Sequence, residues 1–164
     1  MALTQVASGL IASVSGASLT GTQNIPKATL PTGSVLQVVQ GTSSSQTSST
    51  TNTFVTTGLS ASITPSSSSS KIFITATGPA GNFSPSNVAN FTVYRGSTNL
   101  ASATQFQQVY TQSGSYTIWP LTITFLDSPA TTSATTYTVY MQGNDIRFPQ
   151  NGCNSCITLM EISA

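Results

Sequence analysis

From Gly33 to the end of the chain, short segments in which apolar and polar residues alternate are separated by clusters of turn-forming residues. A period of two is the pattern of a β-strand with one buried face. The clearest examples are residues 59–63 and 137–141, while no stretch shows the spacing of an amphipathic helix. We therefore expect an all-β protein of about eight or nine strands, folded as an antiparallel β-sandwich that resembles a jelly roll.

Three local features refine this fold. The consecutive apolar residues within Lys71–Thr77 predict a central strand that is covered on both faces. The turn Arg95–Asn99 predicts a hairpin in which Gly96 or Asn99 has a positive φ. Pro120 lies in an otherwise strand-like segment, where it removes a backbone donor and predicts a bend or a bulge.

Residues 1–33 differ from the rest, with small residues, isolated aliphatic side chains and two prolines five positions apart. The prolines exclude a helix and favour extended backbone. We predict an extended N-terminal anchoring arm over residues 1–33 and the sandwich over residues 34–164. The residues of the arm expected to contact a partner are Ile25, Pro26, Leu30 and Pro31. The arm lacks the pattern of a secretory signal, and the chain lacks the roughly 20 apolar residues of a membrane span, so no membrane insertion is expected.

The sequence has few side chains that can act as acids, bases or metal ligands. The 164 residues include four Lys or Arg, three Asp or Glu and no histidine, against 27 serines and 28 threonines. Because most acid, base and metal chemistry is missing, we expect a structural or binding protein that is not an enzyme and needs no cofactor. The four Lys and Arg residues are scattered along the sequence, so we expect no basic patch that would bind nucleic acid. A net charge of +1 leaves little repulsion between copies, so we expect a homo-oligomer.

Four short segments are distinctive in their order along the chain. They are ITPSSSSSKI (residues 63–72), YRGSTNL (94–100), LDSPATTSATTY (126–137) and ITLMEI (157–162), preceded by GSVLQVVQ (33–40). Over roughly residues 33–164 this set resembles a β-rich, jelly-roll-like module of tailed bacteriophages of marine bacteria and cyanobacteria. Such modules occur in virion surface proteins, such as tail-fibre proteins.

The resemblance implies a virion protein with a jelly-roll-like head that is usually trimeric. We therefore expect a homotrimer on the virion surface, made in the host cytoplasm and bound to other virion proteins, either of the tail or the major capsid protein. Two roles stay open. The resemblance favours a tail-fibre or receptor-binding component that contacts host surface polysaccharide. The short arm without a shaft favours a capsid decoration (cement) protein or a head fibre that stabilises the shell.

Cys153 and Cys156 form the sharpest local motif. Two cysteines without histidine are too few for a structural zinc site in one chain, so no metal is expected. A thioredoxin-like role would need a βα context that the sequence lacks. The two alternatives that remain are a short disulfide that closes the turn before the last strand and a pair of free thiols.

The carboxylates Asp127, Asp145 and Glu161 offer little for catalysis. A glycosidase needs two of them held about 5–9.5 Å apart, and no spacing argument pairs them here. Asp145 is expected in a turn. Arg95 and Asp127 are both expected at strand ends, where an exposed ion pair would contribute about 0–1 kcal/mol. The serine run Ser66–Ser70 is expected to be a solvated loop.

Tyr110, Tyr116 and Trp119 are the candidate ligand-binding residues, because glutamine and serine side chains lie near them in the sequence. Aromatic rings can stack on the apolar faces of sugars while amides bind the hydroxyl groups, which would form a platform for host glycan. The alternative, which we favour, is that Tyr116 and Trp119 belong to the core or to a subunit interface, since large aromatic residues are mostly buried.

Overall fold

The computed structural model describes residues 30–102 and 104–164. Most of the arm predicted at residues 1–33, including Ile25 and Pro26, lies outside the described residues. Apart from the 3-10 turn η3 (Gln150–Gly152), the regular structure there consists of strands. These are β1 (Val35–Ser43), β2 (Thr47–Ile63), β3 (Lys71–Asn82), β4 (Asn87–Arg95), β5 (Thr98–Asn99), β6 (Gln107–Thr111), β7 (Thr117–Asp127), β8 (Thr135–Phe148) and β9 (Ser155–Ile162).

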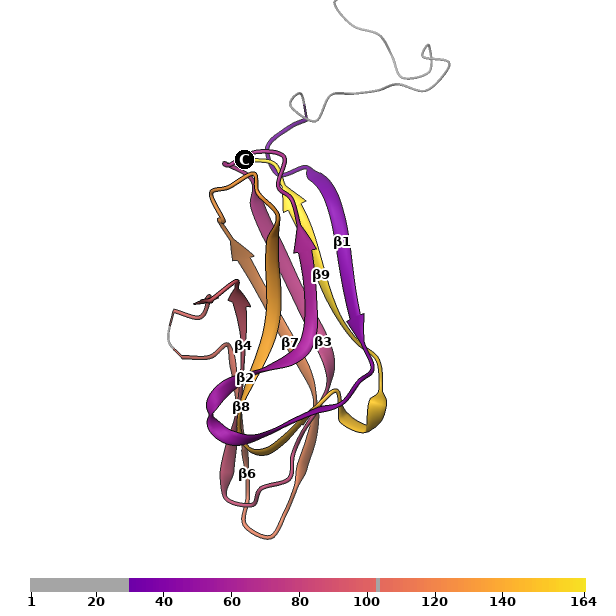
Figure 1. The fold of residues 1–164 in the computed structure, drawn as a ribbon, viewed down its shortest axis with the longest axis vertical. Coiled ribbons are helices and arrows are strands. Elements are labelled where there is room, and N and C mark those ends of the chain that lie inside the picture. Colours follow the sequence, from indigo (N-terminus) through magenta and orange to yellow (C-terminus); the bar gives the residue numbers. More distant parts are fainter. Residues whose placement is uncertain (1–29, 103) are drawn as a thin grey trace, which may run out of the picture. The chain divides into compact units, whose positions relative to one another are not determined.

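The strands form two antiparallel layers (Figure 1). One layer has the order β1-β9-β3-β7 and the other has the order β2-β8-β4-β6. The layers meet where β3 also pairs with the end of β8, at Gly81 opposite Arg147 and Asn82 opposite Ile146. Two four-stranded sheets with these crossovers are the double Greek key of a jelly roll. The predicted all-β, jelly-roll-like sandwich is therefore confirmed.

The core lies between the layers and follows the alternation seen in the sequence. In β2, Leu59, Ala61 and Ile63 point inward, and in β8 Tyr137 and Val139 do the same. The other buried apolar side chains come from both layers: Ile72, Ile74, Ala76, Ala80, Ala89, Phe91, Val93, Leu121, Ile123, Met141, Ile146, Phe148, Ile157 and Leu159. At about 25 cal/mol per Å² of apolar surface, this burial is the main stabilising term of the fold.

Two of the three local predictions needed correction. β3 is central, between β9 and β7, but only one of its faces is buried, because Phe73 on the other face stays half-buried. Pro120 causes no bulge: it lies opposite Pro79 in an uninterrupted register with β3. β7 is an edge strand, so the missing donor of Pro120 costs no ladder bond. The hairpin is confirmed, with φ of +57° at Gly96 and Arg95 opposite Thr98.

The two ends of the sandwich differ. We call the end at which the chain enters β1 the proximal end and the opposite end the distal end. At the proximal end, the chain enters β1 beside the C-terminus, and the Gly33 amide donates to the Ser163 carbonyl at 2.8 Å. Leu30 is half-buried there and Pro31 is exposed. The distal end carries the β3–β4 loop (residues 83–86) and the β6–β7 loop (residues 112–116), at the bottom of Figure 1.

Candidate functional site

An exposed aromatic stack marks the distal end. Tyr116, in the β6–β7 loop, is 67% exposed. Its ring stacks on Phe83 of the β3–β4 loop, with centroids 5.5 Å apart and planes 12° apart. The guanidinium of Arg147 contacts the same Phe83 ring, at 4.2 Å from its centroid. The side chains of two loops and of β8 therefore hold one another in place, and the Tyr116 ring remains available to solvent. We call Phe83, Tyr116 and Arg147 the distal stack.

A β-bulge in β8 positions the charged part of the distal stack. Ser49 pairs with Ile146 and Thr50 with Asn144, so Asp145 between them has no partner on β2. Asp145 has a φ of +52° and is not in the turn that the sequence predicted. Its carboxylate accepts from Arg147 Nε at 3.0 Å and Nη2 at 3.2 Å. Its carbonyl accepts from the Phe83 amide at 3.0 Å, which ties the loop to the bulge.

Amide and hydroxyl groups surround the distal stack. The Ser84 hydroxyl accepts from Asn87 Nδ2 at 3.5 Å and from Asn144 Nδ2 at 3.3 Å, and Asn82 Oδ1 accepts from the Ser84 amide at 3.1 Å. An exposed ring beside amides, a hydroxyl and one exposed ion pair can stack on an apolar sugar face and hydrogen-bond to sugar hydroxyls. The geometry is that of a shallow polar contact surface.

The three predicted aromatic residues do not form one platform. Tyr110 lies on the edge strand β6 and is 58% exposed, and Tyr116 belongs to the distal stack. Trp119 packs edge-on against the core residue Phe91, with ring centroids 5.9 Å apart. Trp119 is thus half-buried against the core, as the core alternative expected. Tyr116 is not a core residue, since its loop extends beyond the sandwich, and its place in a subunit interface stays a prediction. Phe83 and Arg147 were not identified as site residues from the sequence. The signal that could have indicated Phe83 is an aromatic residue in the turn-like segment NFSPSN (residues 82–87).

Glu161 has a structural position at the proximal end. The inward period of β9 places it among core residues with no exposure. Its carboxylate accepts from Gln37 Nε2 at 2.6 Å, the Ser66 amide at 2.7 Å and the Ser66 hydroxyl at 2.6 Å. Burial raises the pKa of Glu161, but hydrogen bonds from Ser66, Ser70 and Gln37 outweigh it and lower the pKa to about 2. The serine run is largely an exposed loop, as its composition predicted, and Ser66 within it also donates two hydrogen bonds to this carboxylate.

Asp127 anchors a second structural network. It is buried at the end of β7 and accepts from Arg95 Nη1 at 2.7 Å and from the Tyr137 hydroxyl at 2.7 Å. The predicted Arg95–Asp127 pair forms, but the carboxylate is not exposed as the sequence suggested. Burial and the hydrogen bond to Asp127 raise the pKa of Tyr137, so its hydroxyl remains a donor. This network joins two of the segments that carry the resemblance, residues 94–100 and 126–137.

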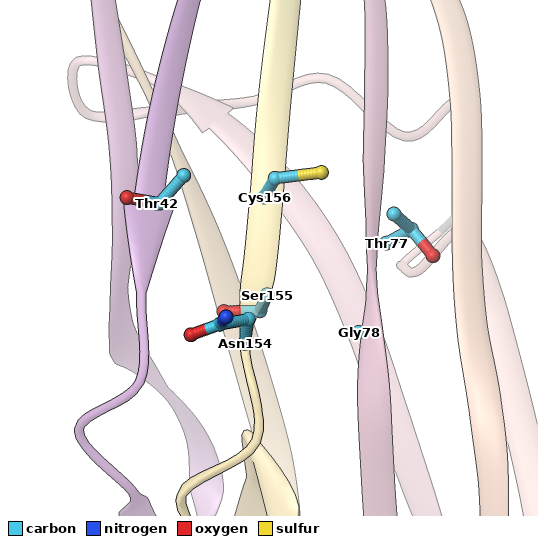
Figure 2. Close-up of a pocket in the computed structure, with 6 residues that line it drawn as sticks. All are labelled: Thr42, Thr77, Gly78, Asn154, Ser155 and Cys156. Atoms are coloured by element: carbon cyan, nitrogen blue, oxygen red, sulfur yellow. The ribbon is translucent and has the colours of Figure 1, made fainter.

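The thiols of Cys153 and Cys156 are free. Cys153 is exposed after η3, whereas Cys156 is half-buried on the outer face of β9, and no disulfide joins them in this structure. Beside Cys156 is a hollow of about 260 Å³ that includes Thr42 and Thr77 (Figure 2). Within the described residues, no three His, Cys, Asp or Glu side chains gather as a metal site would require.

In the same described ranges, no helix has the length and apolar character needed to cross a bilayer.

The fold and its sites define a jelly-roll β-sandwich with an exposed distal contact surface. No protein-family model matches the chain, and no curated protein matches it. Solved structures of infectious bursal disease virus, Gx and Gt strains, align with TM-scores of 0.46 and 0.44 at 15% and 14% identity. A mutant VP2 protein of that virus, from derived T=1 particles, aligns with a TM-score of 0.43 at 13% identity. Each alignment covers 89% of this chain but only 42%, 43% and 41% of the other chain, respectively, so this chain spans less than half of their length.

Proposed function

We propose that this protein is a non-enzymatic structural component of the virion surface of a tailed bacteriophage. Within that role we propose a tail-fibre or receptor-binding function, in which the distal end contacts polysaccharide on the host surface. The observation that carries the proposal is the distal stack, since it exposes an oriented aromatic ring at the end of the sandwich opposite the arm connection. The resemblance of the segments between residues 33 and 164 supports the phage assignment.

The positions of the carboxylates support a role without catalysis. Glu161 and Asp127 are each held by hydrogen bonds inside the sandwich, and only Asp145 belongs to the distal end. A glycosidase of the usual kind needs two carboxyl groups at the scissile bond. Asp145 alone, paired with Arg147, does not meet that requirement.

A capsid decoration role is the second candidate. It is favoured by the outer face of the β1-β9-β3-β7 sheet, which is broad, nearly free of charge and suited to packing against protein. In that role the arm and the face would bind only the assembled shell and stabilise it by mass action.

Immunogold labelling of intact virions separates the two roles. Label on the tail or its tip supports receptor binding, label spread over the head supports decoration, and the absence of label from all particles would overturn the virion proposal. The full-length protein is the antigen, and virions from which the protein is genetically deleted are the control.

Glycan binding tests the distal surface directly. We expect the full-length protein to bind polysaccharide purified from the host surface, and Tyr116→Ala to weaken this binding at least about tenfold. Val35→Ala is the matched control, because Val35 is also exposed but lies at the proximal end, opposite Ile162. Equal binding by both variants would remove the distal stack from the proposal, and release of sugar fragments by the wild type would contradict a non-enzymatic role.

A further inference from the structure

One outer face of the sandwich carries an apolar row that crosses four strands. Val38 of β1 lies opposite Met160 of β9, Met160 lies opposite Phe73 of β3, and Phe73 lies opposite Leu126 of β7. Val38 is 56% exposed and Leu126 is 47% exposed, while Met160 and Phe73 are half-buried. We call these four residues the apolar row. Directly opposed residues of an antiparallel sheet point to the same side, so the row is continuous from one edge of the layer to the other.

The rest of this face is polar but almost without charge. The next two rows consist of hydroxyl, amide and thiol side chains: Gln40, Thr158, Thr75 and Thr124, then Thr42, Cys156, Thr77 and Thr122. The hollow of Figure 2 lies in the second of these rows. Lys71, next to Phe73 along β3, is the one charged residue among the described outward positions of these four strands. Depletion of charge around an apolar centre is the composition of an interface core.

The outer face of the β2-β8-β4-β6 layer is different, because its side chains already use one another as partners. Tyr94 packs on Tyr140 at 4.2 Å between ring centroids. Asn90 Nδ2 donates to Gln142 Oε1 at 3.1 Å, and Gln108 Nε2 donates to Asn90 Oδ1 at 2.9 Å. The apolar row has no such cover within the described residues, so it is the face that gains most from an added partner.

We propose that the apolar row and the two rows beside it form the surface through which two copies of this chain associate. The inference does not depend on the proposed function. It takes up the homo-oligomer that the low net charge predicts, with a pair of copies in place of the homotrimer implied by the resemblance, and adds the face that they use. A flat, nearly neutral surface is complementary to itself, because a second copy brings apolar and hydroxyl groups and no repulsive charge. With a net charge of +1 for the whole chain, long-range repulsion between copies is small.

The size of the face is suitable for such a contact. Four strands about 4.8 Å apart and about nine residues long present a projected area of roughly 500 Å², and side-chain relief makes the accessible area larger. A standard interface removes about 800 Å² from each partner, so this face can supply most of a stable contact.

Sedimentation velocity of the full-length protein between about 1 and 100 µM tests the proposal. We expect the wild type to sediment as an oligomer, and Val38→Lys and Leu126→Lys each to weaken association at least about tenfold. Tyr110→Lys is the matched control, since Tyr110 is equally exposed but lies on β6 of the other layer. Urea unfolding verifies that each variant is folded, and if one row variant is not, the other one decides.

A wild type that remains monomeric over this range would overturn the proposal, as would row variants that associate like the wild type or a control that dissociates equally. These outcomes can be told apart from those of the functional tests, although the decoration role would use the same face against the shell. A protein that labels virions but does not associate through this face would refute the interface alone, and one that associates but is absent from virions would refute the proposed function alone.

Discussion

Acid should unfold this protein mainly through one residue, Glu161. Its pKa in the folded protein is about 2, against an ordinary value of 4.5. A carboxyl group whose pKa is lowered on folding stabilises the folded state above its unfolded pKa and loses that contribution as the pH falls toward the folded pKa. At 1.36 kcal/mol per pKa unit the whole contribution is about 3 kcal/mol, of which about 2.5 kcal/mol should be lost between pH 7 and pH 2.5.

The assay is urea unfolding at pH 7, 5, 3.5 and 2.5, followed by the fluorescence of Trp119, the single tryptophan, which packs on the core. In Glu161→Gln the free energy of unfolding should be lower than in the wild type at pH 7, because an amide cannot accept all the donors that Gln37 and Ser66 direct at this position. Between pH 5 and pH 2.5 this variant should lose about 2.5 kcal/mol less than the wild type does.

Asp145→Asn is the matched control, since the Asp145 carboxylate is exposed and pairs with Arg147 at the distal end. Its stability should follow the pH dependence of the wild type. The chain has three side-chain carboxylates and no histidine. Equal acid sensitivity of the wild type and Glu161→Gln would refute the assignment.

Four further substitutions test the fold. Tyr137→Phe removes a buried donor to Asp127 and should lower the free energy of unfolding by about 1–3 kcal/mol in urea titrations at pH 7. Gly96→Ala places a side chain at a φ of +57° and should cost about 1 kcal/mol, seen as a lower thermal midpoint. Trp119→Ala should cost at least about 2 kcal/mol, read by far-UV circular dichroism, whereas Tyr110→Ala should change stability by less than about 0.5 kcal/mol. Similar costs for these last two would contradict their assigned positions.

The strands could be predicted from the sequence because the alternation of apolar and polar side chains indicates which face of a strand is buried. The alternation in β2 correctly indicates that Leu59, Ala61 and Ile63 face the core. The glycine of the β4–β5 turn correctly indicates the hairpin. The sequence could not show whether the outer face of each sheet is covered, because that depends on what packs against it. Phe73 looks like a core residue in the sequence, yet it lies in the apolar row.

The sites were harder to predict because they depend on contacts between distant segments. Glu161 meets Ser66 across 95 positions, and neither residue type signals the other. The bulge at Asp145 follows from pairing with β2 and leaves no local pattern. Tyr116 was a candidate because it is an aromatic residue among polar neighbours in the sequence, but its stacking partner Phe83 comes from another loop.

The pairing of β1 with β9 at the proximal end has a mechanical consequence. Among the residues that the structure describes, β1 is bonded along one side, to β9, from Val35 opposite Ile162 to Ser43 opposite Ser155. A pull on the N-terminal segment, resisted at the distal loops, would load β1 along its own axis. The hydrogen bonds of this ladder lie across that axis, so they would share the load in shear and would not open one at a time. A strand connected in this way would resist such a pull better than one whose hydrogen bonds opened in sequence.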